Sequence, residues 1–192
     1  QDDPCFKETQ GKGREMTADD FVYSFKRLAD PKNSSPGWWV FETRIKGLDA
    51  WREAASKSGA ADYTAAIEGL KAVDRYTLRL ELNQAAHIFL YTLAMTFTQV
   101  VPHEAVETYG KEFLNHPVGT GPFRLESFNG SSRIVYLRNP TYRKELYPSE
   151  GEPGDKEAGL LQDAGKPLPL VDKIVVDVLV ESQPLWLQFM AG

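Results

Sequence analysis

Two runs of alternating residues on either side of Asn129-Gly130 constrain the fold of this chain more than any other feature. The runs cover residues 123–128 and 133–138, and an Asn-Gly pair between such runs is a strong short-range signal for a β-hairpin. A second hairpin is predicted over residues 70–82, where leucines at every second position give one buried and one solvated face. Residues 173–180 (KIVVDVLV) predict one further strand.

Helical periodicity is clearest just after Thr17, which has the chemistry of an N-cap and precedes acids in the first turn. Apolar residues then recur at helical spacing until Pro31 ends the segment. Further helices are expected over residues 48–57, 62–69, 87–95, 103–109 and 184–192. Residues 144–170 are expected to form a long surface loop with one helical turn around 157–162. This order of elements predicts a mixed α/β (α+β) fold without regular βαβ alternation.

The bulk composition is that of a globular protein. The chain has 192 residues, 42% of them hydrophobic, which is enough for one ordinary core or two small ones. A shift in composition near Val101-Pro102 weakly marks a boundary between residues 1–102 and 103–192. The 22 Lys and Arg residues are outnumbered by 27 Asp and Glu residues, so no nucleic-acid partner is expected. No apolar run approaches the roughly 20 residues of a membrane-spanning helix.

Few residues point to catalysis or to metal binding. His87, His103 and His116 lack the i,i+4 spacing of a helix-borne metal pair, and the single Cys5 excludes zinc sites built on several thiolates. The GxG of residues 119–121 leads into a strand, which favours a tight turn over a phosphate loop. There is no GxSxG motif, and no pair of carboxylates stands out. We therefore predict no enzyme activity, no cofactor and no metal.

The aromatic cluster Trp38-Trp39-Val40-Phe41 follows a Ser-Pro-Gly loop. Neighbouring side chains of an extended segment face opposite ways, so both tryptophans cannot point into one core if this segment is extended. Two interpretations stay open at this point. The cluster either packs in a core and against another lobe, or it turns a ring toward a ligand, since binding pockets favour large rigid rings.

Several motifs occur together in one order along the chain. Residues 16–31 (MTADDFVYSFKRLADP) are similar to the pattern T-A-x-D-V-x-x-S-x-x-R, and residues 117–123 (PVGTGPF) to P-V-G-T-G-P-Y/F. Residues 133–142 (RIVYLRNPTY) are similar to R-I-V-L-x-R-N-P-x-Y, and residues 187–192 (LQFMAG) to the segment before G-E-x-D. Jointly they resemble the family 5 extracellular solute-binding proteins, which include oligopeptide-, dipeptide- and nickel-binding periplasmic proteins.

The resemblance implies a partial periplasmic-binding-protein type II architecture. Family members have two lobes that close over a ligand, and an extra sub-domain. Residues 1–102 would be part of that sub-domain of the first lobe, and residues 103–192 part of the first lobe with hairpin, strand and helix. The second lobe would be absent, so the chain is expected to be an internal piece.

The function implied is that of a monomeric substrate-binding component of an ABC importer. It would capture oligopeptides reversibly and deliver them to a permease in the inner membrane. The implied location is periplasmic or otherwise extracytoplasmic, with lipid anchoring left open. A nickel chelate or an oligosaccharide is the alternative ligand on the same scaffold, and a hydrolase or sensor domain is the alternative from another class.

The resemblance also gives candidate ligand-binding residues. The segment 35–41 matches a stretch that supplies an aromatic ring to the cleft in relatives, and the segment 95–99 lies where relatives run past the ligand. Residues 119–121 return the chain toward the cleft. The candidates are Trp38, Trp39, Phe41, Met95, Thr96, Phe97 and Thr120.

Overall fold

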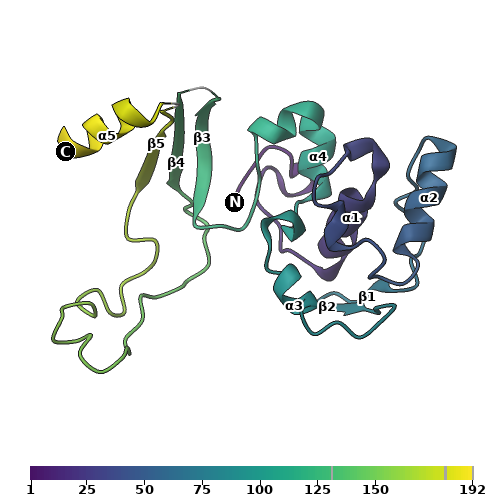
Figure 1. The fold of residues 1–192 in the computed structure, drawn as a ribbon, viewed down its shortest axis with the longest axis horizontal. Coiled ribbons are helices and arrows are strands. Elements are labelled where there is room, and N and C mark those ends of the chain that lie inside the picture. The colour runs from purple at the N-terminus through teal and green to yellow at the C-terminus, as the bar shows by residue number, and fades with distance from the viewer. Residues whose placement is uncertain (131, 180, 192) are drawn as a thin grey trace. The chain divides into compact units, whose positions relative to one another are not determined.

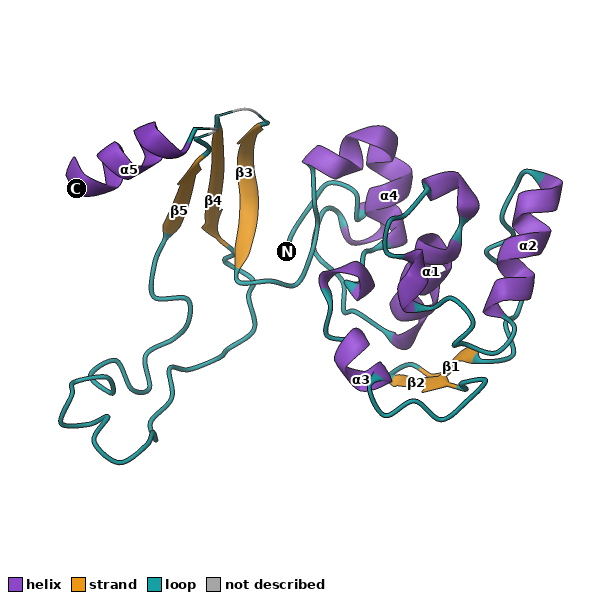
Figure 2. Ribbon diagram, viewed as in Figure 1, coloured by secondary structure: helices purple, strands orange, loops and turns teal. Residues whose placement is uncertain are grey.

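The computed structural model describes residues 1–130, 132–179 and 181–191, which divide into two compact units (Figures 1 and 2). The helical unit comprises residues 5–9 and 14–110. The sheet unit comprises residues 1–4, 10–13 and the described residues from Lys111 onward. The units therefore separate after Gly110, a few residues later than the expected boundary at Val101-Pro102. The assignment of the units to lobes stays a prediction.

The helical unit contains four α-helices and a small hairpin that packs against α1. Figure 2 shows this hairpin at one edge of the unit, near α3. Its elements are α1 (Ala18–Ala29), α2 (Leu48–Ser58), β1 (Leu70–Asp74), β2 (Thr77–Leu80), α3 (Phe89–Thr92) and α4 (His103–Tyr109). Single 3-10 turns lie at Lys7–Thr9, Pro31–Asn33, Trp38–Val40 and Thr96–Thr98. The predicted helices over residues 17–29, 48–57 and 103–109 and the hairpin over residues 70–82 are confirmed.

Helix α1 begins and ends where its sequence requires. Asp20, in the first turn, accepts a hydrogen bond from the backbone N–H of Thr17 at 2.8 Å, which satisfies one free donor before the helix. At the other end Asp30 leaves helical geometry directly before Pro31. The apolar face of α1 is buried through Phe25, Leu28 and Ala29.

The core of the helical unit lies between α1, α2 and the hairpin. Val40, Phe41, Ile45 and Leu48 have no exposed surface. The ring of Phe41 packs between those of Phe25 and Phe89, with centroid distances of 4.6 Å and 6.3 Å. Burying side chains of this size stabilises a fold by about 1.5–3 kcal/mol each.

The predicted helix over residues 62–69 is wrong, because tertiary hydrogen bonds hold this segment in turns. Nζ of the buried Lys26 donates to the carbonyl oxygens of Tyr63 and Ala65 at 2.7 Å and 2.8 Å. Trp51 Nε1 donates to the carbonyl of Asp62 at 2.9 Å. The Asp62 carboxylate accepts from the backbone N–H of Thr64 at 2.8 Å, as in an Asx turn. These carbonyls and amides are thus engaged outside any helix.

The predicted helix over residues 87–95 is shorter than expected, since α3 covers only Phe89–Thr92. The hydroxyl of Thr98 donates to the carbonyl oxygens of Leu93 and Met95, both at 2.8 Å. The Thr98 side chain therefore occupies carbonyl oxygens that would accept backbone N–H groups in a longer helix. The chain then turns into the Thr96–Thr98 segment.

The sheet unit contains an antiparallel sheet of order β3-β4-β5. Its strands are β3 (Phe123–Asn129), β4 (Arg133–Arg138) and β5 (Lys173–Asp177), and α5 (Ser182–Ala191) follows. The predicted hairpin is confirmed, with a bulge between Leu125 and Ser127 on β3. The predicted strand over residues 173–180 ends at Asp177, and Val180 lies outside the described residues. The predicted final helix is confirmed as far as Ala191.

The loop between β4 and β5 closes on itself. Leu146 and Pro167 form an isolated bridge, and the backbone N–H of Tyr147 donates to the carbonyl of Lys166 at 2.9 Å. Inside this stem the chain forms successive turns in place of the expected helical turn over residues 157–162. Gly154 and Gly159 adopt φ values of 100° and 76°, which interrupt right-handed helical geometry.

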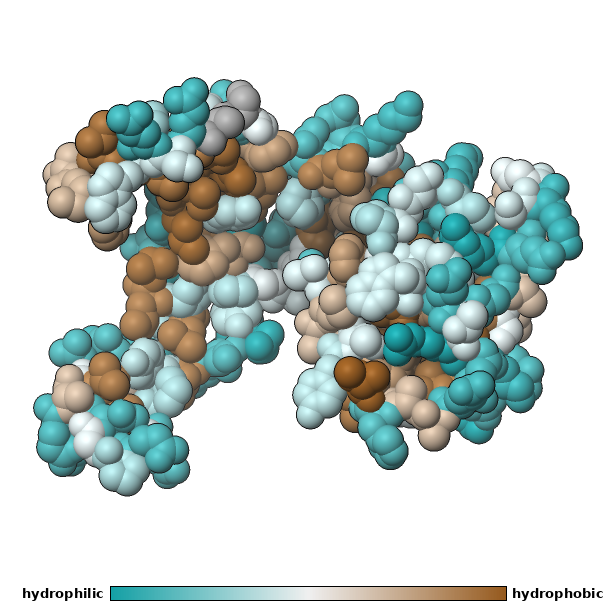
Figure 3. Space-filling model, in the orientation of Figure 1, coloured by the Kyte–Doolittle hydropathy of each residue, from teal (hydrophilic) through white to brown (hydrophobic). Residues whose placement is uncertain are grey.

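The apolar residues of β5 and α5 are exposed. Figure 3 shows apolar side chains gathered over the strands of the sheet unit, and Val175, Val176 and Phe189 are among the exposed residues. Among the described residues, no helix combines the length and the apolarity needed to cross a membrane.

Candidate ligand-binding site

The two adjacent tryptophans of the helical unit face different surroundings. Residues 38–40 form a 3-10 turn and not an extended segment, and the two side chains differ in burial. Trp38 packs partly buried against the core, and the guanidinium carbon of Arg52 lies 4.8 Å from the centroid of its ring. Trp39 remains 47% exposed. The structure thus leaves one of the two tryptophan rings available at the surface.

Phe97 meets Trp39 although the two residues are far apart in the sequence. Their ring centroids lie 6.4 Å apart with an interplanar angle of 77°, an edge-to-face arrangement. Phe97 is 37% exposed and belongs to the turn that Thr98 holds by its hydroxyl hydrogen bonds. We call Trp39 and Phe97 the aromatic pair. It is a rigid apolar surface on two short turns that the core supports.

The other sequence-predicted candidates occupy different positions. Phe41 is fully buried between Phe25 and Phe89, so its side chain has no surface for a ligand and we remove it from the candidate site. Met95 packs partly buried against the core, and Thr96 is exposed on the turn that carries Phe97. Thr120 is exposed in the sheet unit. Its role stays a prediction separate from the aromatic pair.

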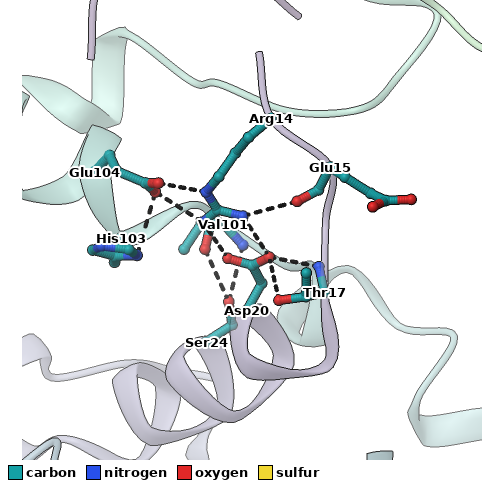
Figure 4. A network of polar contacts seen from close by, with 8 residues as sticks. All are labelled: Arg14, Glu15, Thr17, Asp20, Ser24, Val101, His103 and Glu104. Atoms are coloured by element: carbon teal, nitrogen blue, oxygen red, sulfur yellow. Dashed lines mark hydrogen bonds and ion pairs between the residues drawn. The ribbon is translucent and has the colours of Figure 1, made fainter. Parts of the chain in front are cut away.

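Sequence reasoning missed a charged network at the first turns of α1 and α4, drawn in Figure 4. The Arg14 guanidinium donates to both Asp20 carboxylate oxygens, at 2.8 Å and 2.6 Å. It also donates from Nη2 to Glu104 Oε2 at 2.9 Å and from Nε to the other Glu104 oxygen. One arginine thus joins two helix starts by paired hydrogen bonds, the geometry that makes such contacts strong. No local pattern links Arg14 to Glu104.

The network is partly buried, which changes the acidity of its carboxyl groups. Burial alone would raise the pKa of Asp20, but hydrogen bonds from Arg14 and from the Thr17 backbone outweigh it and lower the pKa. Burial would likewise raise the pKa of Glu104, and hydrogen bonding from Arg14 brings it below its ordinary value. Both groups therefore stay ionised at neutral pH. The Arg14 guanidinium and the Thr17 backbone N–H both donate to carboxylates of the helical unit. We therefore assign the network a structural role.

A cavity of about 460 Å³ in the helical unit adjoins this network. It is lined by residues 5–9 and by the α4 side chains of His103, Glu104 and Glu107, together with Arg14. The Arg14 guanidinium group is already paired with the carboxylates of Asp20 and Glu104. Among the described residues, no group of His, Cys, Asp and Glu side chains could hold a metal ion. The aromatic pair is therefore the stronger candidate for contact with a ligand.

The fold of the described residues matches part of the type II periplasmic-binding-protein fold. A crystal structure of a periplasmic oligopeptide-binding protein from Borrelia burgdorferi matches with a TM-score of 0.69 and 23% identity, over 93% of this chain and 31% of that one. Haemophilus influenzae OppA in complex with RPPGFSPFR matches with a TM-score of 0.70 and 20% identity, over 94% of this chain and 30% of that one. At these identities the likeness establishes the fold alone.

The sequence places the chain in a family. Residues 11–192 match the model of the bacterial extracellular solute-binding proteins, family 5 Middle, and the chain belongs to this family. The resemblance read from the motifs is thereby confirmed.

Curated relatives carry different ligands in their names. The periplasmic oligopeptide-binding protein OppA of Escherichia coli is 33% identical over 133 residues, which make up 68% of this chain and 23% of the relative. The probable deoxycholate-binding periplasmic protein YgiS of the same organism is 32% identical over 134 residues, 68% of this chain and 24% of the relative. The chain thus spans about a quarter of the length of these relatives.

Proposed function

We propose that this chain belongs to the substrate-binding component of an ABC importer, which captures peptides outside the cytoplasm and hands them to a membrane permease. The observation that carries the proposal is the family match over residues 11–192. Relatives named for oligopeptides and for di- and tripeptides support peptides as the ligand class. Capture is reversible and involves no covalent chemistry.

Within this function, the aromatic pair is the part of the helical unit proposed to contact the ligand. Trp39 and Phe97 present large rigid rings that lose little conformational entropy on binding, and the turns that carry them are fixed by the core and by Thr98. Trp38, Met95 and Thr96 of the helical unit stay proposed ligand contacts beside the pair. Thr120, in the sheet unit, stays a separate proposal. Backbone hydrogen bonds from a peptide would add affinity without demanding one sequence.

The experiment is to purify the full-length protein from its native host and to identify bound small molecules by mass spectrometry after denaturation. A mixture of short peptides is the expected result. A single steroid acid, the chemistry in the name of one relative, would overturn the peptide assignment, and so would a metal chelate or an oligosaccharide. Hydrolysis of an added peptide would contradict the binding function itself.

A further inference from the structure

Gly37 lies directly before the 3-10 turn that carries Trp39, in a buried position. Its backbone angles, φ −89° and ψ 1°, are open to residues with side chains. The conformation at this position therefore does not require glycine. The reason for glycine has to be the space around it.

That space is filled by Phe97. A Cβ atom at Gly37 would lie 2.6 Å from Cδ1 and Cγ of Phe97 and 2.7 Å from its Cβ, well inside van der Waals contact. Rotation of the phenyl ring cannot relieve the last of these contacts, because Cβ is fixed by the backbone. Even the smallest side chain at position 37 would push apart the turn of Phe97 and the turn of Trp39.

Both turns are anchored on either side of this contact. The backbone N–H of Gly37 donates to Ser35 Oγ at 3.2 Å, and the carbonyl of Gly37 accepts from the N–H of Val40 at 3.0 Å. On the other side the Thr98 hydroxyl holds its turn through two carbonyl oxygens. The contact between Phe97 and Gly37 therefore sets the distance between the rings of Trp39 and Phe97.

We infer that Gly37 is a positioning residue that sets the geometry of the aromatic pair, and that the pair receives a flat apolar side chain of the ligand, preferably aromatic. This inference rests on the proposed function. Two half-exposed rings at 77° present two apolar walls nearly at right angles, so a planar side chain can lie on the face of one ring and meet the edge of the other.

The test uses the full-length protein, its Gly37→Ala and Phe97→Gly variants, and the double variant. Phe97→Gly removes all three atoms that a Cβ at position 37 would meet. The probes are oligoalanines of three to five residues and the same peptides with one alanine replaced by phenylalanine, measured by isothermal titration calorimetry. Wild type is expected to prefer the phenylalanine peptide by about five- to tenfold, the size of an aromatic contact. Gly37→Ala is expected to reduce that ratio to below about twofold.

The double variant separates positioning from general damage. In the Phe97→Gly background, Gly37→Ala should change neither the peptide preference nor the urea midpoint, because the atoms it would strike are gone. Additive losses in the double variant would overturn the inference, and so would an unchanged phenylalanine preference in Gly37→Ala.

A second measurement needs no ligand. The near-ultraviolet circular dichroism that Trp39 owes to Phe97 should be lost in Gly37→Ala as fully as in Phe97→Gly, and an unaltered signal in Gly37→Ala would contradict the positioning role. A wild-type protein that binds no peptide but loses this signal in Gly37→Ala would refute the proposed function while upholding the positioning of the pair.

Discussion

The helical unit and the sheet unit bury their apolar residues to very different extents. In the helical unit Phe41, Ile45 and Leu48 have no exposed surface, whereas Val175 and Val176 of the sheet unit are 45% and 40% exposed. Of the apolar side chains that are buried among the described residues, all but one belong to the helical unit. A packed core can hold exposed rings at a fixed geometry. The helical unit, which carries both rings of the aromatic pair, has such a core.

The largest expected effect is on the core. Phe41→Ala should lower the free energy of unfolding by about 3–5 kcal/mol, because it leaves a cavity between Phe25 and Phe89. Val176→Ala, a smaller truncation in the sheet unit, should cost less than about 1 kcal/mol, both because fewer atoms are removed and because the side chain is only partly covered. Urea denaturation of the 192-residue chain measures both. Equal losses in the free energy of unfolding would contradict the difference in packing between the two units.

The next largest effect concerns Arg14. Arg14→Met leaves the carboxylates of Asp20 and Glu104 without their shared partner, and should destabilise the helical unit by about 2 kcal/mol, less than the cost of breaking a fully buried pair. The control is Arg75→Met, which breaks an exposed ion pair with Glu15 and should cost about 0–1 kcal/mol. A neutral Arg14→Met would show that this network contributes nothing to stability.

The same network predicts a dependence on pH. The pKa values of Asp20 and Glu104 lie below their ordinary values in the folded chain, so the unfolded chain binds protons more readily. Their stabilisation is present in full above about pH 5 and is lost as the pH falls through the folded-state pKa values. Between pH 6 and pH 3, the urea midpoint of Asp20→Asn should therefore fall less steeply than that of wild type. If the urea midpoints of the two proteins fell in parallel with pH, the Asp20 carboxylate would not be a source of this pH dependence.

The smallest effect on stability comes with a clear effect on binding. Trp39→Ala should change the free energy of unfolding by less than about 0.5–1 kcal/mol but weaken peptide binding by the full-length protein about five- to tenfold, since the ring is half exposed. Tyr91→Ala removes another exposed aromatic ring of the helical unit, outside the pair, and should leave affinity unchanged. If both variants bind peptide as wild type does, the pair has only a structural role.

Local sequence patterns predicted those elements whose determinants are themselves local. The hairpin over residues 123–138 formed as expected because its turn and its alternating runs are adjacent. Residues 62–69 failed to form a helix because Lys26 and Trp51, distant in sequence, take their carbonyl groups. Helix propensity depends on the local sequence and therefore does not predict such tertiary hydrogen bonds.

The same limit applies to the candidate site. Trp39 and Phe41 are both aromatic and nearly adjacent, and only the 3-10 turn and the packing around it decide which ring is buried. The contact of Gly37 with Phe97 and the pairing of Arg14 with Glu104 join distant segments, so no periodicity in one sequence reveals them.

We propose that the helical unit presents the aromatic pair to a ligand. Hydrogen–deuterium exchange of the full-length protein, with and without a bound peptide, tests it most directly. We expect the ligand to slow exchange in the turns at residues 38–40 and 96–98 and to leave α2, which carries neither ring of the pair, unchanged. Unchanged exchange in both turns, with a peptide demonstrably bound, would contradict it.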